Sequence, residues 1–294
     1  MAGAVDAGVL RVAYQEHGPP DGPAAILLHG FPYDVHAYAE VAPRLASAGC
    51  RVVVPYLRGY GPTRFLSDTT PRSGEQAALG ADLLALMDAL GIGKAIVAGY
   101  DWGGRAACIV AALWPERVTG LVTGDGYNIQ NIARASLPAD AESEYRYWYQ
   151  WYLHGARGAA GLEKDRDGFC RLLWRLWSPD WAFDEATFQR SAAAFANPDF
   201  VEVVVHSYRH RYGLVPGDPT YAGIEAKLAV QPRIAVPTVS LHGDSDGVAA
   251  PARDERVRRM FGLDFRALHL PRIGHNIPQE APQAFADAVL SLIR

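Results

Sequence analysis

The chain has 294 residues, enough for one large α/β domain or for a domain that carries a sizeable insertion. Its 28 lysine and arginine residues stand against 32 aspartate and glutamate residues, and the resulting net charge of −4 argues against a nucleic-acid-binding protein. With 49% apolar and 20% charged residues, the composition is that of a folded globular protein and excludes a disordered or fibrous one.

Membrane spans, secretion signals and disulfide frameworks are not expected either. The longest apolar runs, such as 106–113, fall far short of a bilayer span, and residues 1–8 show no signal-peptide pattern. The three cysteines are widely spaced and odd in number, which favours buried reduced thiols: Cys50, Cys108 and Cys170. We therefore expect a cytoplasmic protein with no nucleic-acid or membrane partner.

Short apolar runs alternate with segments in which apolar residues have helical spacing along the first half of the chain, and the same pattern occurs again near the end. In chain order, the sequence predicts strands and helices at these positions: strands at 24–28, 51–55, 95–98, 118–123, 236–241 and 265–270, and helices at 76–90, 105–114 and 279–292. β-branched runs separated by helices indicate βαβ units and a parallel sheet buried on both faces. The expected fold class is therefore α/β, with a mostly parallel, doubly wound sheet.

The middle of the chain, 128–232, has helical patterns but no alternation of strand and crossover. It holds five of the seven tryptophans and seven of the fourteen tyrosines. We interpret it as a helical cap inserted into one core domain, which is formed by residues 1–127 and 233–294. An independent second domain is the alternative, but the flanking pieces each lack enough strands to close a core alone.

Residues 99–104 read Gly-Tyr-Asp-Trp-Gly-Gly and join a predicted strand to a predicted helix. A turn this tight requires small residues around its centre, and glycines flank the central Asp101. The pattern is that of a nucleophile elbow with aspartate in the place of the usual serine. A glycine-rich turn in which Asp101 only caps the helix is the alternative.

Two later segments follow predicted strands and bring an acid and a base. Asp246 lies in Gly-Asp-Ser-Asp-Gly after the strand at 236–241, and His275 follows the strand at 265–270. The chain order Asp101, Asp246, His275 is the order of nucleophile, acid and base expected on successive strand ends of a doubly wound sheet.

The loop after the first predicted strand reads His29-Gly30-Phe31-Pro32 and is expected beside the elbow. The backbone N–H of Phe31 and that of Trp102 are the candidate donors of an oxyanion hole. An ordinary Gly-Pro turn is the alternative for this loop.

Two other patterns are set aside. Ser245 formally occupies the centre of a G-x-S-x-G motif, but it comes at the point in the chain order where the acid belongs. His206 and His210 have the i, i+4 spacing of metal ligands, yet no glutamate base or third ligand accompanies them.

Taken together, these motifs resemble the α/β-hydrolase superfamily, and within it the branch of epoxide hydrolases and dehalogenases, most closely the epoxide hydrolases. The resemblance covers nearly the whole chain and implies the α/β-hydrolase fold with an inserted cap. Its specific motifs are His29-Gly30-Phe31-Pro32, Arg58-Gly59-Tyr60-Gly61, Tyr100-Asp101-Trp102-Gly103-Gly104, Pro115-Glu116-Arg117-Val118, Asp246 and Gly274-His275. In this branch the reaction intermediate is an alkyl ester on the elbow aspartate.

In epoxide hydrolases, two cap tyrosines hydrogen-bond the ring oxygen as it becomes an alkoxide. The stretch Tyr-Trp-Tyr-Gln-Trp-Tyr resembles the segment that carries the first, at Tyr149, and His-Ser-Tyr-Arg resembles the second, at Tyr208. Tyr147 and Tyr152 remain alternatives to Tyr149, because one turn of helix separates the candidates. We expect a largely apolar pocket lined by His29, Phe31, Trp102, Tyr147, Gln150, Trp151 and Tyr152.

These features predict an epoxide hydrolase that converts a small apolar epoxide and water into a vicinal diol through an ester on Asp101, hydrolysed by water that His275 activates. No metal or organic cofactor is expected, and the chain is expected to be a monomer or a homodimer. The main alternative is a haloalkane or haloacid dehalogenase with the same three residues. Arg105 matches one arginine of the fluoroacetate-specific group, but Trp102 stands where that group has another. A ligand-binding protein without catalysis is the third hypothesis.

Overall fold

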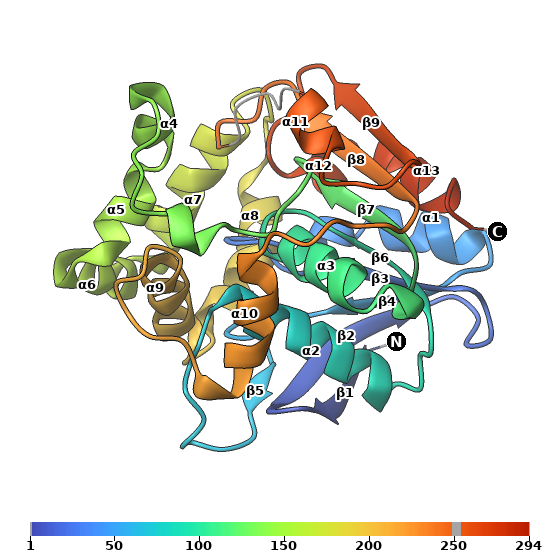
Figure 1. The fold of residues 1–294 in the computed structure, drawn as a ribbon, viewed down its shortest axis with the longest axis horizontal. Coiled ribbons are helices and arrows are strands. Elements are labelled where there is room, and N and C mark those ends of the chain that lie inside the picture. The colour runs from blue at the N-terminus through green and yellow to red at the C-terminus, as the bar shows by residue number, and fades with distance from the viewer. Residues whose placement is uncertain (1, 249–253, 294) are drawn as a thin grey trace.

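A nine-stranded sheet runs through the computed structural model, which describes residues 2–248 and 254–293 (Figure 1). The strands are β1 (Ala2–Ala7), β2 (Leu10–His17), β3 (Ala24–Leu28), β4 (Arg51–Pro55), β5 (Arg64–Phe65), β6 (Ala95–Gly99), β7 (Val118–Gly124), β8 (Thr238–Gly243) and β9 (Phe265–Leu270). Their order across the sheet is β1-β2-β4-β3-β6-β7-β8-β9, and β5 pairs with β2. All neighbours from β4 to β9 are parallel, whereas β2 is antiparallel to each of its partners.

Helices cover both faces of this sheet. The described α-helices are α1 (Val41–Ser47), α2 (Gln76–Ala89), α3 (Asp101–Leu113), α4 (Ala141–Arg146), α5 (Trp148–His154), α6 (Ala156–Lys164), α7 (Arg166–Trp177), α8 (Glu185–Ala192), α9 (Phe200–His210), α10 (Ala222–Ala229), α11 (Asp254–Arg258), α12 (Ile277–Glu280) and α13 (Pro282–Leu290). Helices α2 and α3 pack together on one face, and α1 and α13 pack together on the other (Figure 1). Because both faces are covered, the apolar strands β3, β4 and β6 are buried along almost their whole length. The predicted mostly parallel, doubly wound α/β sheet is confirmed.

Some predicted boundaries differ from the structure. The antiparallel hairpin of β1 and β2 was not expected, because the Ala- and Gly-rich sequence of β1 has weak strand propensity. Strand β8 begins after Pro237, since proline has no N–H to donate to a neighbouring strand. The predicted closing helix is two helices, α12 and α13, because Pro282 disfavours a helical conformation at Ala281, whose φ and ψ are −136° and 60°.

Helices α4 to α10 all lie between β7 and β8 in the chain, and α4 to α9 lie together beside the sheet (Figure 1). Helix α10 returns to pack against α2. The division into a core and a cap over 128–232 stays a prediction. Within the described residues, no helix is long and apolar enough to cross a membrane.

Candidate active site

Asp101 sits at a sharp turn between β6 and α3, in a backbone conformation that L-amino acids rarely adopt. Its φ is +50°, in the left-handed region. The turn closes only because its neighbours are small: a Cβ on Gly99 would lie 2.5 Å from the carbonyl carbon of Gly103, and one on Gly103 would lie 2.0 Å from the carbonyl oxygen of Leu28. This is the strained strand–turn–helix geometry that displays a side chain at the carboxyl edge of a sheet.

The Asp101 carboxylate is held by the loop that follows β3. The backbone N–H of Phe31 donates a hydrogen bond of 2.8 Å to Oδ1. Gly30 allows this approach, because a Cβ there would lie 2.5 Å from the Cβ of Asp101. Burial alone would raise the pKa of Asp101, but the hydrogen bond and charge of His275, the charge of Arg105 and the Phe31 N–H lower it below its usual value. The carboxylate is therefore ionised at neutral pH.

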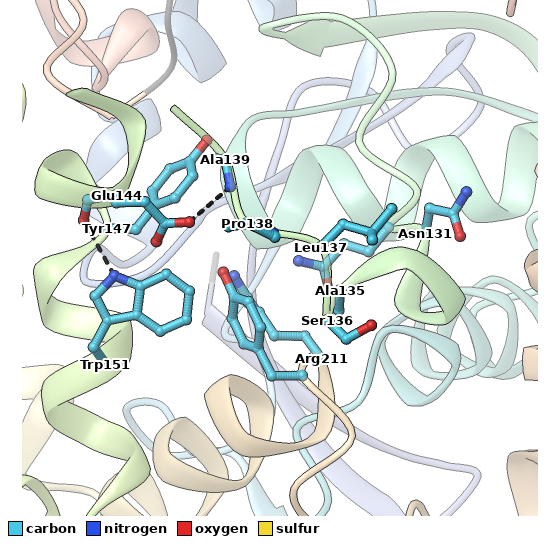
Figure 2. Close-up of a pocket in the computed structure, with 12 residues that line it drawn as sticks. Asn131, Ala135, Ser136, Leu137, Pro138, Ala139, Glu144, Tyr147, Trp151 and Arg211 are labelled. Carbon is cyan, nitrogen blue, oxygen red and sulfur yellow. Dashed lines mark hydrogen bonds between the residues drawn. The ribbon is translucent and has the colours of Figure 1, made fainter. Parts of the chain in front are cut away.

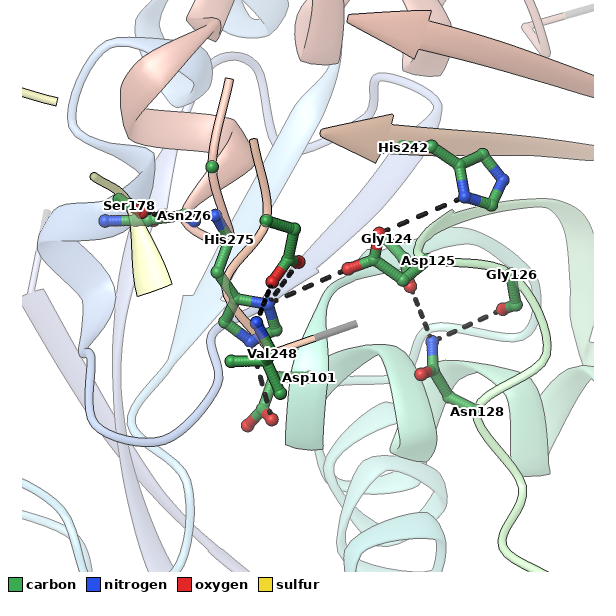
Figure 3. Close-up of polar contacts among 12 residues, drawn as sticks. Asp101, Gly124, Asp125, Gly126, Asn128, Ser178, His242, Val248, His275 and Asn276 are labelled. Carbon is green, nitrogen blue, oxygen red and sulfur yellow. Dashed lines mark hydrogen bonds and ion pairs between the residues drawn. The ribbon is translucent and has the colours of Figure 1, made fainter. Parts of the chain in front are cut away.

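His275 lies between two carboxylates that come from different strand ends (Figure 3). Its Nδ1 lies 2.7 Å from Oδ2 of Asp246, and its Nε2 lies 3.7 Å from Oδ2 of Asp101. Asp246 also accepts a 2.6 Å hydrogen bond from the backbone N–H of Val248. Burial lowers the pKa of His275, but Asp246 and Asp101 more than offset this and raise it well above its usual value. The structure thus brings together the three residues that the motifs single out.

A third carboxylate, Asp125, lies beside this group and was not expected from the sequence. It directly follows β7, has a φ of +59°, and places Oδ2 3.7 Å from Nδ1 of His275 (Figure 3). Burial and the neighbouring Asp246 raise the pKa of Asp125 well above its usual value. A protonated Asp125 then donates to Asp246, which agrees with the hydrogen bond from Asp125 that helps to lower the pKa of Asp246. The signal that the sequence offered was an acidic residue directly after β7, the strand that neighbours β6, at whose end the elbow lies.

The two predicted tyrosines come from helices α5 and α9 and pack against each other; Tyr149 lines the cavity over Asp101, and Tyr208 does not. The ring centroids of Tyr149 and Tyr208 are 5.3 Å apart. The hydroxyl of Tyr149 accepts a 3.0 Å hydrogen bond from Gln150, and the buried hydroxyl of Tyr208 has no hydrogen-bond partner among the described residues. Burial raises the pKa of both phenols, so both carry a proton to donate at neutral pH.

A cavity of about 250 Å³ opens over Asp101. It is lined by Asp101, Arg105, Asp125, Asn128, Gln130, Tyr147, Tyr149, Gln150, Arg211, Tyr212, Val248 and His275. Of the expected pocket residues, Tyr147 and Gln150 line it. The others do not belong to this lining: His29, Phe31, Trp102, Trp151 and Tyr152.

The contacts of these five side chains explain why they lie outside the cavity lining. His29 is fully buried, and its Nε2 accepts from the backbone N–H of Leu57, so it fastens two loops together. Phe31 and Trp102 are fully buried and their rings stack at 5.7 Å, and Phe31 reaches Asp101 only through its backbone N–H. Trp151 lines a neighbouring cavity, and the hydroxyl of Tyr152 lies against Gly161 of the next helix, α6.

Known proteins resemble this chain in sequence and in fold. The family described as alpha/beta hydrolase fold matches residues 23–259. The chain belongs to that family. A Klebsiella pneumoniae protein of known structure, described as a "putative epoxide hydrolase", is 46% identical, with a TM-score of 0.95 over 99% of this chain and 96% of its own. Epoxide hydrolase A of Mycobacterium tuberculosis is 24% identical over 98% of this chain and 96% of its own, and haloalkane dehalogenase of Mycobacterium marinum is 25% identical over 98% and 90%.

The two patterns set aside in the sequence have other roles in this alpha/beta hydrolase. The hydroxyl of Ser245 donates to Asp180, away from the elbow. His206 accepts at Nδ1 from the backbone N–H of Gly74 and donates at Nε2 to the carbonyl of Pro216, which ties α9 to its neighbours.

Two groups of potential metal ligands occur in the described parts of this hydrolase, with ligand atoms within 4.8 Å of one another. One is Asp125, Asp246 and His275, already joined by hydrogen bonds. The other is Glu75, His210 and Glu225, in which both glutamates accept hydrogen bonds from backbone N–H groups.

Proposed function

We propose that this hydrolase is an epoxide hydrolase that works through an alkyl ester on Asp101. The observation that carries the proposal is the convergence of an ionised elbow carboxylate, Asp101, with the protonated phenol of Tyr149 around one cavity, while the ring of Tyr208 packs against Tyr149 at 5.3 Å. A nucleophile on one side of a strained ring and acids on the other are what ring opening requires. The names of the relatives support the same chemistry.

In the first half-reaction, an oxygen of Asp101 attacks an epoxide carbon and the ring C–O bond breaks. The ring oxygen takes a proton from Tyr208 or Tyr149, and the product is a hydroxyalkyl ester of Asp101. Tyr149 is the better placed donor, because it lines the cavity with Asp101 and its hydroxyl only accepts from Gln150, which leaves its own proton free, whereas Tyr208 is not part of that lining. We propose that the helices of 128–232 act as a cap that supplies both phenols.

In the second half-reaction, His275 removes a proton from water, and the hydroxide attacks the carboxyl carbon of Asp101. The N–H groups of Phe31 and Trp102 stabilise the tetrahedral oxyanion, the acyl C–O bond breaks, and the diol leaves while the tyrosine recovers its proton. Asp246 orients the ring of His275 and stabilises its positive charge, as the 2.7 Å contact implies.

A single turnover in H₂¹⁸O, with enzyme in excess over styrene oxide, tests the covalent step. The diol is expected to be unlabelled, because its new oxygen comes from Asp101, and the label should appear in the Asp101 carboxylate by peptide mass spectrometry. Label in the first-turnover diol would overturn the ester mechanism. As a second arm, His275→Gln is expected to accumulate the ester, seen as an intact-mass increase equal to one substrate.

One observation favours a dehalogenase as the second candidate. The chain is 25% identical over 98% of its length to a haloalkane dehalogenase of Mycobacterium marinum, and a dehalogenase would use the same Asp101 and His275. Measuring halide release from a haloalkane and haloacid panel beside diol formation separates the two activities. The Tyr149→Phe, Tyr208→Phe double variant should lose diol formation, whereas dehalogenation does not need these hydroxyls.

A further inference from the structure

The cavity over Asp101 has a strongly polar wall, unlike the apolar pocket that the sequence predicts. Among its lining residues in the described chain, Val248 is the only aliphatic one, and two arginines, Arg105 and Arg211, face the same space. A second cavity of about 510 Å³ adjoins it (Figure 2). The two cavities share Gln130, Tyr147, Arg211 and Tyr212.

Neither guanidinium has an acidic partner. Arg105 is 7% exposed and Arg211 is 8% exposed, yet no carboxylate of residues 2–248 and 254–293 lies within 4.0 Å of either guanidinium. Arg105 donates from Nε to the carbonyl of Asn128 at 3.2 Å, and Arg211 donates to the hydroxyl of Ser207 at 3.3 Å. The Nε of Arg211 is buried and has no hydrogen-bond partner in the described chain. Most of the five donors of each guanidinium are therefore left for something else.

Arg58 is a buried arginine with a structural role, and it provides a comparison for Arg105 and Arg211. Arg58 is 1% exposed, and its Nε and Nη2 donate to the two oxygens of Asp82 at 2.6 and 2.7 Å. Burying a guanidinium without a counter-charge is costly, so it is rare unless a ligand supplies the charge. The contrast with Arg58 points to a ligand at Arg105 and Arg211 rather than to packing.

The charges around the cavity also change during the proposed reaction. Burial, together with the like charge of Arg211, lowers the pKa of Arg105 to about 10, so that Arg105 remains protonated at neutral pH. Asp101 balances part of this positive charge in the free enzyme. Esterification removes the charge of Asp101, and the two arginines then face a neutral ester in a water-poor site. Glu144 lines only the adjoining cavity, where its carboxylate accepts from the backbone N–H of Ala139 (Figure 2).

We propose that the substrate is an epoxide that also carries a carboxylate, which binds between Arg105 and Arg211 while the ring lies over Asp101. This rests on the proposed epoxide hydrolase function and specifies its substrate class. A carboxylate suits the site because its two oxygens match the paired donors of a guanidinium. Its charge replaces the one that Asp101 loses on esterification. The cavity of about 250 Å³ limits the substrate to a short epoxy acid unless it extends into the adjoining cavity.

The test compares two substrates of nearly the same shape, 3-phenylglycidate and its primary amide, on the wild type and three variants. Arg211→Gln removes the charge, and Arg211→Lys keeps it. Arg209→Gln is the matched control: Arg209 lies in α9, two residues before Arg211, and donates at 3.0 Å to the carbonyl of His154, but it does not line the cavity. Thermal melts of each variant exclude unfolding as the cause of a change.

The wild type should prefer the acid over the amide in kcat/KM by at least about tenfold, the value of one hydrogen bond to a charged group. Arg211→Gln should remove that preference, Arg211→Lys should retain part of it, and Arg209→Gln should leave it as in the wild type. A rival role exists, because the Arg211 guanidinium lies 4.2 Å over the ring of Tyr208 and favours its phenolate. In that case Arg211→Gln lowers kcat equally for acid and amide, and the carboxylate proposal is overturned.

Calorimetry with 3-phenylpropanoate and 3-phenylpropanamide provides a readout that does not depend on turnover. Tighter binding of the acid by the wild type, lost in Arg211→Gln, supports the carboxylate subsite even if neither epoxide is opened. Equal binding of acid and amide by the wild type overturns it. Failure of both epoxides to react, with the acid still bound selectively, would instead count against the epoxide hydrolase function alone.

Discussion

The relative weight of the two acids beside His275 can be measured by replacing each with asparagine. Asp246→Asn removes the partner at 2.7 Å but leaves Asp125 at 3.7 Å from the same nitrogen. Because the charge of Asp246 is one cause of the raised pKa of Asp125, its removal should let Asp125 ionise and take over part of the role. The net loss is then one hydrogen bond to a charged group, about 1.5–3 kcal/mol, or about 10–150-fold in rate.

The other two variants complete the series. Asp125→Asn still offers an N–H to Asp246, so its cost should be smaller than that of Asp246→Asn. The double variant leaves no acid at His275, and its loss should approach the about 10⁴-fold seen when a serine-protease triad loses its aspartate. The losses should be strongly non-additive, because either acid can partly replace the other at the imidazole, so that only the double variant leaves His275 without an acid.

Stopped-flow single turnovers, followed by the fluorescence of tryptophans such as Trp177, whose ring lies 5.2 Å from that of His275, separate ester formation from ester hydrolysis. We expect the losses in the hydrolysis step, where His275 acts as base. The reasoning is refuted if Asp125→Asn is more damaging than Asp246→Asn, or if the single losses multiply to give the double.

Three further predictions concern the phenols, the elbow and the base. Tyr149→Phe should slow ester formation by at least about 10²-fold and Tyr208→Phe by less, since general acids contribute about 10²–10⁴-fold; equal effects on ester hydrolysis would contradict this. Gly103→Ala should cost about 1–3 kcal/mol or prevent folding, because its Cβ would lie 2.0 Å from a backbone oxygen of β3, whereas Gly93→Ala, with nothing within 4 Å, should leave the urea midpoint nearly unchanged. Burial lowers the pKa of His275, but neighbouring carboxylates raise it well above its usual value, so the acid limb of kcat should lie above about pH 6.5. The raised pKa of His275 also means that its protonation stabilises the folded chain. This stabilisation is fully present below about pH 6.5 and is lost as pH rises through the folded pKa. The amount by which the Tm of the wild type exceeds that of His275→Gln should therefore shrink in that range.

The sequence predicted the parts of the molecule that depend on local chemistry. Apolar runs predicted β3, β4, β6 and β7 close to their true bounds, because a strand covered on both faces has to be apolar along most of its length. The elbow was readable because only glycines tolerate the close approach around Asp101.

Long-range contacts decided the rest. Nothing local distinguishes Asp125 from a turn residue after a strand, and its place beside His275 exists only because β7 and β8 are neighbours in the sheet. Likewise, Arg211 reads as a surface charge at the end of an amphipathic helix, but the path of α9 buries it in the same cavity as Arg105.

By itself, then, the sequence determined the fold class and the candidate nucleophile, acid and base, since these follow from residue type at strand ends. Only the tertiary structure decided that a second acid accompanies His275 and that the cavity is polar and positively charged on one side. The physical reason is that burial and charge balance are sums over segments that meet only in the folded chain.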